Sequence, residues 1–188
     1  MPDTEDVRPT KDRIKESMFE ILNEWIPGTD ILELFAGSGS LGIEALSRGA
    51  RSVVFVDRQL KCVETIKENL DSLKIKNYKT HISSARPQVM EPDINPAIVM
   101  QGDVFKALKF FSENHNKFGM IIADPPYGVD NARKLLIKLD TYDIINQPFL
   151  IVIEHSEKDN IPQIEGNIIL LKQYNYGETI LSIYRKKK

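Results

Sequence analysis

The stretch 31–42 constrains the fold of this 188-residue chain more than any other segment. A short apolar run over 31–35 leads directly into Gly37 and Gly39, and apolar residues then recur at helical spacing over 41–46. This order predicts a strand, a tight glycine turn and a helix. Glycines let a backbone approach a ligand closely, and the first N–H groups of a helix are free to bind one. The stretch is therefore typical of the opening of a nucleotide-binding α/β domain.

The glycine pattern alone leaves the ligand open. Gly37-x-Gly39-x-x-Gly42 matches the dinucleotide fingerprint, and Asp57 follows about 20 residues later, where such domains place an acid that binds a ribose. A dehydrogenase is therefore one candidate. A tight turn that binds nothing is also compatible with the pattern, because glycine-rich turns after strands are common. The rest of the chain has to decide between them.

Length and composition restrict the class of protein. At 188 residues and 21.5 kDa the chain suits one domain with a sizeable core, so 1–188 is expected to form a single domain. The net charge of −2 shows no general basic excess, so a nucleic-acid partner would have to bind a local patch. The acidic segment 1–6 does not resemble a signal peptide, and no run approaches the ~18 apolar residues of a membrane span. We therefore expect a cytoplasmic protein with no membrane partner.

The cysteine and histidines favour structural roles. Cys62 is the single cysteine and lies on the apolar face of an expected helix, where a buried structural thiol is favoured over a nucleophile. His81, His115 and His155 lack the spacing of metal ligands. No disulfide and no metal site is expected.

Strands and helices alternate along most of the chain. The apolar runs predict seven strands, over 31–35, 52–57, 97–100, 119–124, 149–154, 168–174 and 179–184. Amphipathic segments between them predict helices over 58–73, 104–113 and 131–139. This alternation predicts an α/β fold with a mostly parallel sheet, closed by a C-terminal antiparallel hairpin. The segment 80–82 is a possible further strand, and the polar segment 83–96 is expected to be an inserted loop.

The N-terminal segment 1–28 is expected to carry a helix with a basic first turn. Thr10 is a plausible N-cap, and Pro27-Gly28 stops the helix. The basic residues of the first turn are Arg8, Lys11, Arg13 and Lys15. They are candidates for contacts to RNA, and a solvated helix end is the other interpretation of the cluster.

Four polar signals follow successive strands of the predicted sheet. They are Glu33 with the glycine turn, Asp57, Asp103 and Asp124-Pro-Pro-Tyr127. Ligands of open parallel sheets bind beyond the carboxyl ends of the strands, so these signals can converge on one pocket. A dehydrogenase is not expected to end its fourth strand with Asp-Pro-Pro-Tyr, whereas methyltransferases that act on amines with S-adenosylmethionine characteristically do. The convergence favours such a methyltransferase.

The tetrapeptide suits methylation of an exocyclic amine. Such an amine is a poor nucleophile because its lone pair is delocalised into the ring. Asp124 can accept one hydrogen of the amine, and the carbonyl of Pro125 can accept the other, its geometry fixed by the rigid Pro125-Pro126 pair. Tyr127 can stack on the base. Asp124 need not be a strong base, because the amine becomes acidic only as it is methylated.

Four segments together resemble the RsmD-type methyltransferases, a family that methylates N2 of one guanine in bacterial small-subunit (16S) ribosomal RNA. The segments are Arg8-Pro-Thr-x-Asp-Arg13, 33–49, Asp124-Pro-Pro-Tyr127 and Tyr176-Gly-Glu-Thr179. The match extends over nearly the whole chain. The resemblance implies a class I, Rossmann-like fold, S-adenosylmethionine as cofactor, and small-subunit RNA or the assembled particle as partner of a monomeric enzyme.

The resemblance also implies roles for individual residues. The methionine part of the cofactor would be held by Glu33, Phe35, Ala36, Gly37, Ser38 and Gly39. Asp57 would bind the ribose with Arg58 nearby, Asp103 and Val104 would bind the adenine, and Asp124 would lie beside both cofactor and guanine. The other cofactor contacts would come from Arg8 and Thr10. The remaining tetrapeptide residues Pro125, Pro126 and Tyr127 would hold the guanine.

Two features depart from the family pattern. Family members usually begin with a basic, glycine-containing hairpin before the Arg-Pro-Thr motif, and this chain starts almost at the motif. RNA docking is expected to differ accordingly, because phosphate contacts supply much of nucleic-acid affinity. The segment 83–96 is also longer than the family leads us to expect, an insertion that costs little in loop-closure entropy.

Three alternatives remain beside this interpretation. One is an amine methyltransferase that acts on adenine N6 or on a protein, against which the Arg-Pro-Thr and Tyr-Gly-Glu-Thr segments weigh. Another is a non-catalytic RNA-binding scaffold, against which the intact 124–126 weighs. The third is the dehydrogenase, which titration with NAD and with S-adenosylmethionine would separate.

Overall fold

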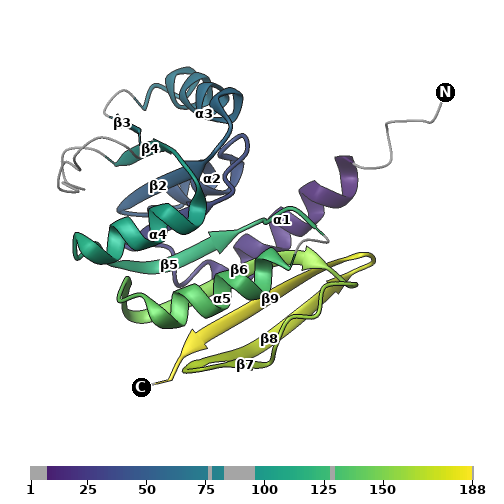
Figure 1. The fold of residues 1–188 in the computed structure, drawn as a ribbon. Coiled ribbons are helices and arrows are strands. Elements are labelled where there is room, and N and C mark those ends of the chain that lie inside the picture. Colours follow the sequence, from purple (N-terminus) through teal and green to yellow (C-terminus); the bar gives the residue numbers. More distant parts are fainter. Residues whose placement is uncertain (1–7, 76–77, 83–95, 128–129, 188) are drawn as a thin grey trace.

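A single sheet between two layers of helices positions everything that follows (Figure 1). The computed structural model describes residues 8–75, 78–82, 96–127 and 130–187. Within these residues the sheet has nine strands, in the order β3-β4-β2-β1-β5-β6-β9-β8-β7.

The helices are α1 (Arg8–Leu22), α2 (Ser40–Ser47), α3 (Leu60–Ser72), α4 (Val104–Glu113) and α5 (Asn131–Thr141). The strands are β1 (Asp30–Leu34), β2 (Ser52–Asp57), β3 (Tyr78–Ile82), β4 (Ala97–Gln101), β5 (Phe118–Ala123), β6 (Ile145–Ser156), β7 (Ile164–Glu165), β8 (Ile168–Tyr176) and β9 (Thr179–Lys186).

The six strands β1 to β6 run parallel, and β9, β8 and β7 continue the sheet in antiparallel pairs. From β1 the sheet extends through β2 and β4 on one side and through β5 and β6 on the other. The connections therefore leave β1 and β5 in opposite directions. Ligands of such sheets bind beyond the carboxyl ends of the strands at this switch point.

The sheet has two strands more than the seven that the sequence predicts, and one of them, β3, contains the segment 80–82 that the sequence indicates as a possible strand. The predicted strands are present as β1, β2, β4, β5, β6, β8 and β9. The additional strands form the two edges, where β3 pairs with β4 and the two-residue β7 pairs with β8. An edge strand has a neighbour on one side only and does not need the continuous apolar run by which buried strands are found. The expected loop over 83–96 lies outside the described residues, except for Pro96.

The predicted N-cap at Thr10 is wrong. Helix α1 already includes Arg8, Pro9 and Thr10, so Thr10 lies within the first turn. Proline is tolerated there because its missing N–H would have no helical acceptor in any case. The Arg-Pro-Thr motif is therefore the start of the helix itself.

Each face of the sheet has its own apolar core. Helices α4 and α5 cover one face, where Phe111 and Leu135 pack with Leu32 of β1. Helices α1, α2 and α3 cover the other face, where Phe19 and Ile66 pack with Ile31 of β1. Because side chains alternate along a strand, Glu33 points to the side of α1 to α3.

A buried polar network joins β6, β9 and β8. His155 Nε2 lies 2.8 Å from Ser182 Oγ, and Gln173 Nε2 donates to the same oxygen at 2.9 Å. His155 Nδ1 lies 2.8 Å from the carbonyl oxygen of Ser156, which can only accept, so Nδ1 carries the proton. Burial lowers the pKa of His155 and keeps the ring neutral. His155 is thus a structural residue of the hairpin half of the sheet.

Candidate functional site

Two adjoining pockets, each of about 540 Å³, lie at the carboxyl ends of the parallel strands. The Asp57 pocket extends over the ends of β2 and β4 as far as Asp103. The Glu154 pocket extends towards α1 and β6 and includes Lys15. The two pockets have three lining residues in common, Phe35, Gly37 and Asp124.

The glycine turn after β1 separates the two pockets. Gly39 has a φ of 74°, and a Cβ atom there would lie 3.0 Å from the side chain of Ile66, so only glycine lets α2 begin this close to α3. A Cβ atom on Gly37 would meet nothing within 4 Å, since this residue faces open space. Phe35 has a φ of 57°, a strained conformation for a bulky residue, at the point where the pockets meet.

Backbone N–H groups hold Asp57 at the end of β2. Its Oδ2 accepts from the N–H of Gly37 at 3.0 Å, and its Oδ1 accepts from the N–H of Gln59 at 2.8 Å. Each carboxylate oxygen can accept a further hydrogen bond. Asp57 therefore fastens the glycine turn to β2 and still presents acceptor positions to its pocket.

Apolar side chains form the opposite wall of the Asp57 pocket. Asp103 caps α4, since its Oδ1 accepts from the N–H of Lys106 at 3.0 Å, and Val104 and Phe105 follow in the first turn. The rings of Phe35 and Phe105 meet edge to face with centroids 6.5 Å apart. A carboxylate on one side and flat apolar walls on the other suit a nucleoside, whose hydroxyls and base need these two surroundings.

Glu33 lines the Glu154 pocket but is almost entirely buried, with 3% of its surface exposed. Its Oε2 accepts from the N–H of Gly42 at the start of α2, at 2.9 Å. Burial raises the pKa of Glu33 to about 8; the N–H groups of Gly42 and Leu41 oppose this shift, and the charge of Asp124 adds to it. The side chain is therefore protonated at neutral pH until a positive charge enters the pocket.

Helix α1 forms the outer wall of the Glu154 pocket. Asp12, Lys15 and Met18 line it, and Lys15 Nζ lies 4.0 Å from Glu44 Oε2. Arg13 is exposed and lines neither pocket. The side chains of Arg8, Thr10 and Lys11 lie outside what the structure describes, so their expected roles are untested.

The tetrapeptide Asp124-Pro-Pro-Tyr127 leaves β5 at the junction of the pockets. The hydroxyl of Tyr127 donates to Glu154 Oε1 at 3.2 Å and lies 3.5 Å from Thr179 Oγ1. Burial and the charges of Glu154 and Asp124 raise the pKa of Tyr127 to about 12, although the hydroxyl of Thr179 opposes the shift. Tyr127 is therefore neutral, and 46% of its surface is exposed, which leaves its ring accessible to a flat partner.

The segment Tyr176-Gly-Glu-Thr179 braces this arrangement from the far end of the chain. The hydroxyls of Tyr176 and Ser17 are hydrogen-bonded, which joins the hairpin to α1. The carbonyl of Glu178 accepts from the N–H of Glu157 at 2.9 Å, which joins the same turn to the end of β6. The segment thus connects α1, β6 and, through Thr179, the tetrapeptide.

The structure brings most of the predicted site residues together. The predicted residues that line one or both pockets are Glu33, Phe35, Ala36, Gly37, Ser38, Asp57, Arg58, Asp103, Val104, Asp124, Pro125, Pro126 and Tyr127. Gly39 lines neither pocket and serves packing instead. Lys15, predicted as an RNA contact, lies inside the Glu154 pocket. The individual roles stay predictions.

The lining residues that the sequence did not predict include Glu154, Phe105 and Cys62. Glu154 follows an apolar run as Asp57 does, and that pattern is the signal that could have found it. Cys62 was expected to be a buried structural thiol, but it is half-buried and faces the Asp57 pocket. The buried stripe of α3 begins one residue later, at Val63.

Among the residues that the structure describes, no cluster of three His, Cys, Asp or Glu side chains is arranged to hold a metal ion. None of the helices in the same part of the chain combines the length and the apolar character that crossing a membrane requires.

Comparisons with known proteins identify the family. Residues 1–185 match the family described as "Conserved hypothetical protein 95". YlbH of Bacillus subtilis, named as a candidate rRNA methyltransferase, is 34% identical over 180 residues, which cover 96% of this chain and 88% of YlbH. Ribosomal RNA small subunit methyltransferase D of Haemophilus influenzae is 30% identical over 184 residues, which cover 97% of this chain and 84% of that protein. The chain belongs to the RsmD-type methyltransferase family.

Membership of the RsmD-type family agrees with the fold. The structure of Escherichia coli yhhF, titled a candidate methyltransferase, matches with a TM-score of 0.75 at 24% identity, covering 100% of this chain and 91% of that chain. The expected class I methyltransferase fold is thus confirmed, with its mostly parallel sheet and C-terminal antiparallel strands. This RsmD-type protein is an S-adenosylmethionine-dependent methyltransferase.

Replacing Gly42 with alanine should destabilise the protein. A Cβ atom there would lie 2.5 Å from Glu33 Oε2 and from the ring of Phe55. Alanine favours helices over glycine by up to about 1 kcal/mol, but this overlap should reverse the sign and lower the free energy of unfolding by about 1–3 kcal/mol. Urea unfolding measures the change. Ser40→Ala, at an exposed position of the same helix, is the control; an equal midpoint for both variants would contradict the close packing at Gly42.

Raising the pH from about 5 to about 8 should destabilise the ligand-free protein through Glu33. Its folded pKa of about 8 lies above the unfolded value of 4.5, so the folded state holds a proton that the unfolded state has released. Stability should therefore fall by about 1 kcal/mol per pH unit as the pH rises from about 5 to about 8, and should level off above pH 8, where both states have released the proton. Glu33→Gln should remove this loss, whereas Glu64→Gln on the exposed side of α3 should keep it. Urea unfolding at several pH values provides the measurement, and a pH profile that Glu33→Gln leaves unchanged would refute the buried acid.

Proposed function

We propose that the protein transfers a methyl group from S-adenosylmethionine to the exocyclic N2 amine of a guanine in small-subunit (16S) ribosomal RNA. The observation that carries the proposal is the position of Asp124-Pro-Pro-Tyr127 at the junction of two pockets, one of which suits a nucleoside. The relatives named for ribosomal RNA methylation support the substrate class. We further propose that the chain acts as one domain, as a monomer, in the cytoplasm.

The pocket residues fit the cofactor. Asp57 offers acceptors for ribose hydroxyls, and the apolar wall with Val104 and Phe105 offers surfaces for the adenine. Glu33 and Lys15 line the other pocket and carry the two kinds of group that would bind the amino and carboxylate ends of the methionine part. The cofactor supplies, when bound, a methyl group made electrophilic by its attachment to a positively charged sulfur.

The tetrapeptide prepares the amine for attack. Asp124 would accept one N–H of the amine and the carbonyl of Pro125 the other, which directs the nitrogen lone pair away from both. A hydrogen bond to a charged acceptor contributes about 1.5–3 kcal/mol, or roughly ten- to a hundredfold in rate. Tyr127, neutral and half exposed, would stack on the guanine. The remaining acceleration would come from alignment of the reactants.

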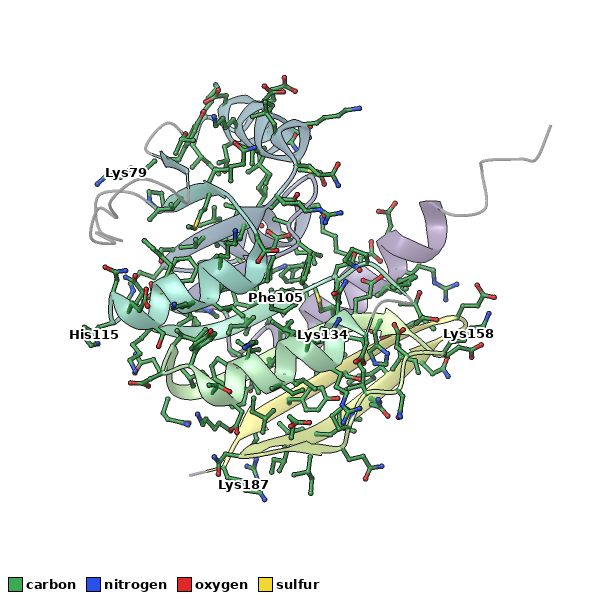
Figure 2. All side chains as sticks on the ribbon, viewed as in Figure 1. Lys79, Phe105, His115, Lys134, Lys158 and Lys187 are labelled. Atoms are coloured by element: carbon green, nitrogen blue, oxygen red, sulfur yellow. The ribbon has the colours of Figure 1, made fainter. Side chains whose placement is uncertain are left out.

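RNA would reach this site over the side of the molecule towards which β5 and β6 run. Figure 2 shows Lys134 and Lys158 on that side, whereas His115 and Lys187 lie at the opposite end. Arg13 and Arg58 are further exposed cations of α1 and of the Asp57 pocket. These cations would contact phosphates while the target base leaves its stack and enters the pocket.

Methyl transfer with labelled S-adenosylmethionine tests the reaction and the substrate together. The substrates are small-subunit RNA and assembled small-subunit particles from cells that lack the gene, followed by nucleoside analysis. N2-methylguanosine is the expected product. Label in N6-methyladenosine, or no label in RNA despite cofactor binding, would refute the proposal.

Asp124→Ala should reduce methyl transfer by at least a hundredfold while cofactor affinity stays within a few-fold, because Asp124 is assigned to the amine. Initial rates and isothermal titration calorimetry measure the two quantities. Glu113→Ala, an exposed acid at the end of α4 that lines neither pocket, is the control and should keep the rate. A large loss of cofactor affinity in Asp124→Ala would show that the assignment is wrong.

Asp57→Asn should weaken cofactor binding by about ten- to a hundredfold. The amide has a single acceptor oxygen, which cannot hold the N–H groups of Gly37 and Gln59 and the ribose hydroxyls together. Calorimetric titration with S-adenosylmethionine is the measurement, and Glu68→Gln on exposed α3 is the matched control. Equal affinity of the Asp57 and Glu68 variants would exclude Asp57 from the cofactor site.

A further inference from the structure

We propose that Glu154 selects guanine, by accepting the hydrogen bond from N1–H beside the amine that Asp124 holds. This would make Glu154 a specificity-determining residue of the methyl-transfer site. The inference rests on the proposed function and deepens it, since it concerns how the site around Asp124 distinguishes guanine from adenine.

The register of the sheet brings Asp124 and Glu154 together. Ala123 of β5 pairs with Ile153 of β6 in the parallel ladder. Asp124 and Glu154 are the next residues, so their backbones lie on neighbouring strands about 5 Å apart. Ala123 and Ile153 point into the core under α4 and α5, and alternation therefore turns Asp124 and Glu154 to the other face. Both acids line the Glu154 pocket there.

The hydrogen bonds of Glu154 leave it able to bind a substrate. Its Oε1 accepts from the hydroxyl of Tyr127 at 3.2 Å, which fixes the carboxylate beside the ring assigned to stacking. Among the residues that the structure describes, none donates a hydrogen bond to Oε2. Glu154 is half-buried, so this oxygen is shielded without being closed off.

Glu33, another acid of the pocket, is unsuited to this role. It pairs in register with Ile122, two residues before Asp124, and is therefore set deeper along the strands. It is buried and bound to the N–H of Gly42. Glu154 is the acid that stands beside Asp124.

Two adjacent carboxylates match guanine and not adenine. Guanine presents N1–H and the N2 amine side by side, two donors in a row, and a carboxylate can only accept. Adenine presents a bare N1 lone pair next to its N6 amine, so a carboxylate at the second position would face an acceptor and repel it. A site whose carboxylate accepts from N1–H rejects a base that lacks this N–H, because the carboxylate is then left without a hydrogen-bond donor.

The test compares two RNAs that differ at this one position. A synthetic RNA spanning the guanine that the wild-type protein methylates is made with guanine or with 2-aminopurine there, and is assembled into particles if the particle is the substrate. 2-Aminopurine keeps the N2 amine but has a bare N1. The measured quantity is the ratio of kcat/KM for the two RNAs, in which other properties of the analogue cancel between protein variants.

Glu154→Gln should lower the preference for guanine about ten- to a hundredfold. The amide oxygen can still accept from Tyr127, while the amide N–H₂ opposes N1–H of guanine and donates to N1 of 2-aminopurine. The affinity for S-adenosylmethionine should stay within a few-fold. Glu157→Gln, an exposed acid just beyond β6 that lines neither pocket, is the matched control and should keep the wild-type ratio.

Other outcomes would overturn the inference, each in a recognisable way. If Glu154 only holds Tyr127, then Glu154→Gln and Tyr127→Phe will slow both RNAs alike and leave the ratio unchanged. An unchanged ratio with active wild-type protein refutes the role of Glu154 and leaves the proposed function intact. If the wild-type protein methylates no guanine at all, the proposed function fails, and the inference fails with it.

Discussion

The hydrogen bond from the N–H of Gly37 to Asp57 is the constraint on which the rest of the site depends. It ties the loop after β1 to the end of β2, and the bond from the N–H of Gly42 to Glu33 ties the start of α2 back to β1. The two acids thus hold the glycine turn from both sides. Because Gly37 and Phe35 separate the two pockets, the shape of each pocket follows from these bonds.

Clustering acids at one edge of the sheet has an electrostatic consequence. Glu33, Asp124 and Glu154 line one pocket. Burial raises the pKa of Glu33 to about 8 and the charge of Asp124 adds to the shift, so Glu33 holds a proton in the ligand-free protein. A pocket of this kind favours cationic ligands over neutral ones of the same shape, which agrees with a cofactor that carries a sulfonium and an ammonium group.

The sequence predicted the acids of the site better than the other side chains that line its pockets. Asp57 and Asp124 were found because an acid or a turn follows an apolar run, and parallel strands bring such positions to one edge. Phe105 and Cys62 were missed because whether a helix residue faces the core or a pocket depends on how the helix lies on the sheet. Glu154 follows an apolar run as Asp57 does, so the same local pattern could have found it, but its place beside Asp124 is set by the pairing of β5 with β6.

Contacts between distant parts of the chain also explain why the sequence carries motifs near both ends together with Asp-Pro-Pro-Tyr. Side chains of α1 and of the C-terminal hairpin help to hold the tetrapeptide in place. Strand β5 fixes the start of the tetrapeptide, but the hydroxyl of Tyr127 is held by Glu154 and approached by Thr179. Tyr176, in the same turn as Thr179, is hydrogen-bonded to Ser17 of α1. The tetrapeptide and Glu154, which are assigned to the base, are therefore held in place only when α1, the parallel strands and the C-terminal hairpin have all assembled. A loosened hairpin would therefore affect Tyr127 directly, and through Tyr127 the edge of the Asp57 pocket that the tetrapeptide lines.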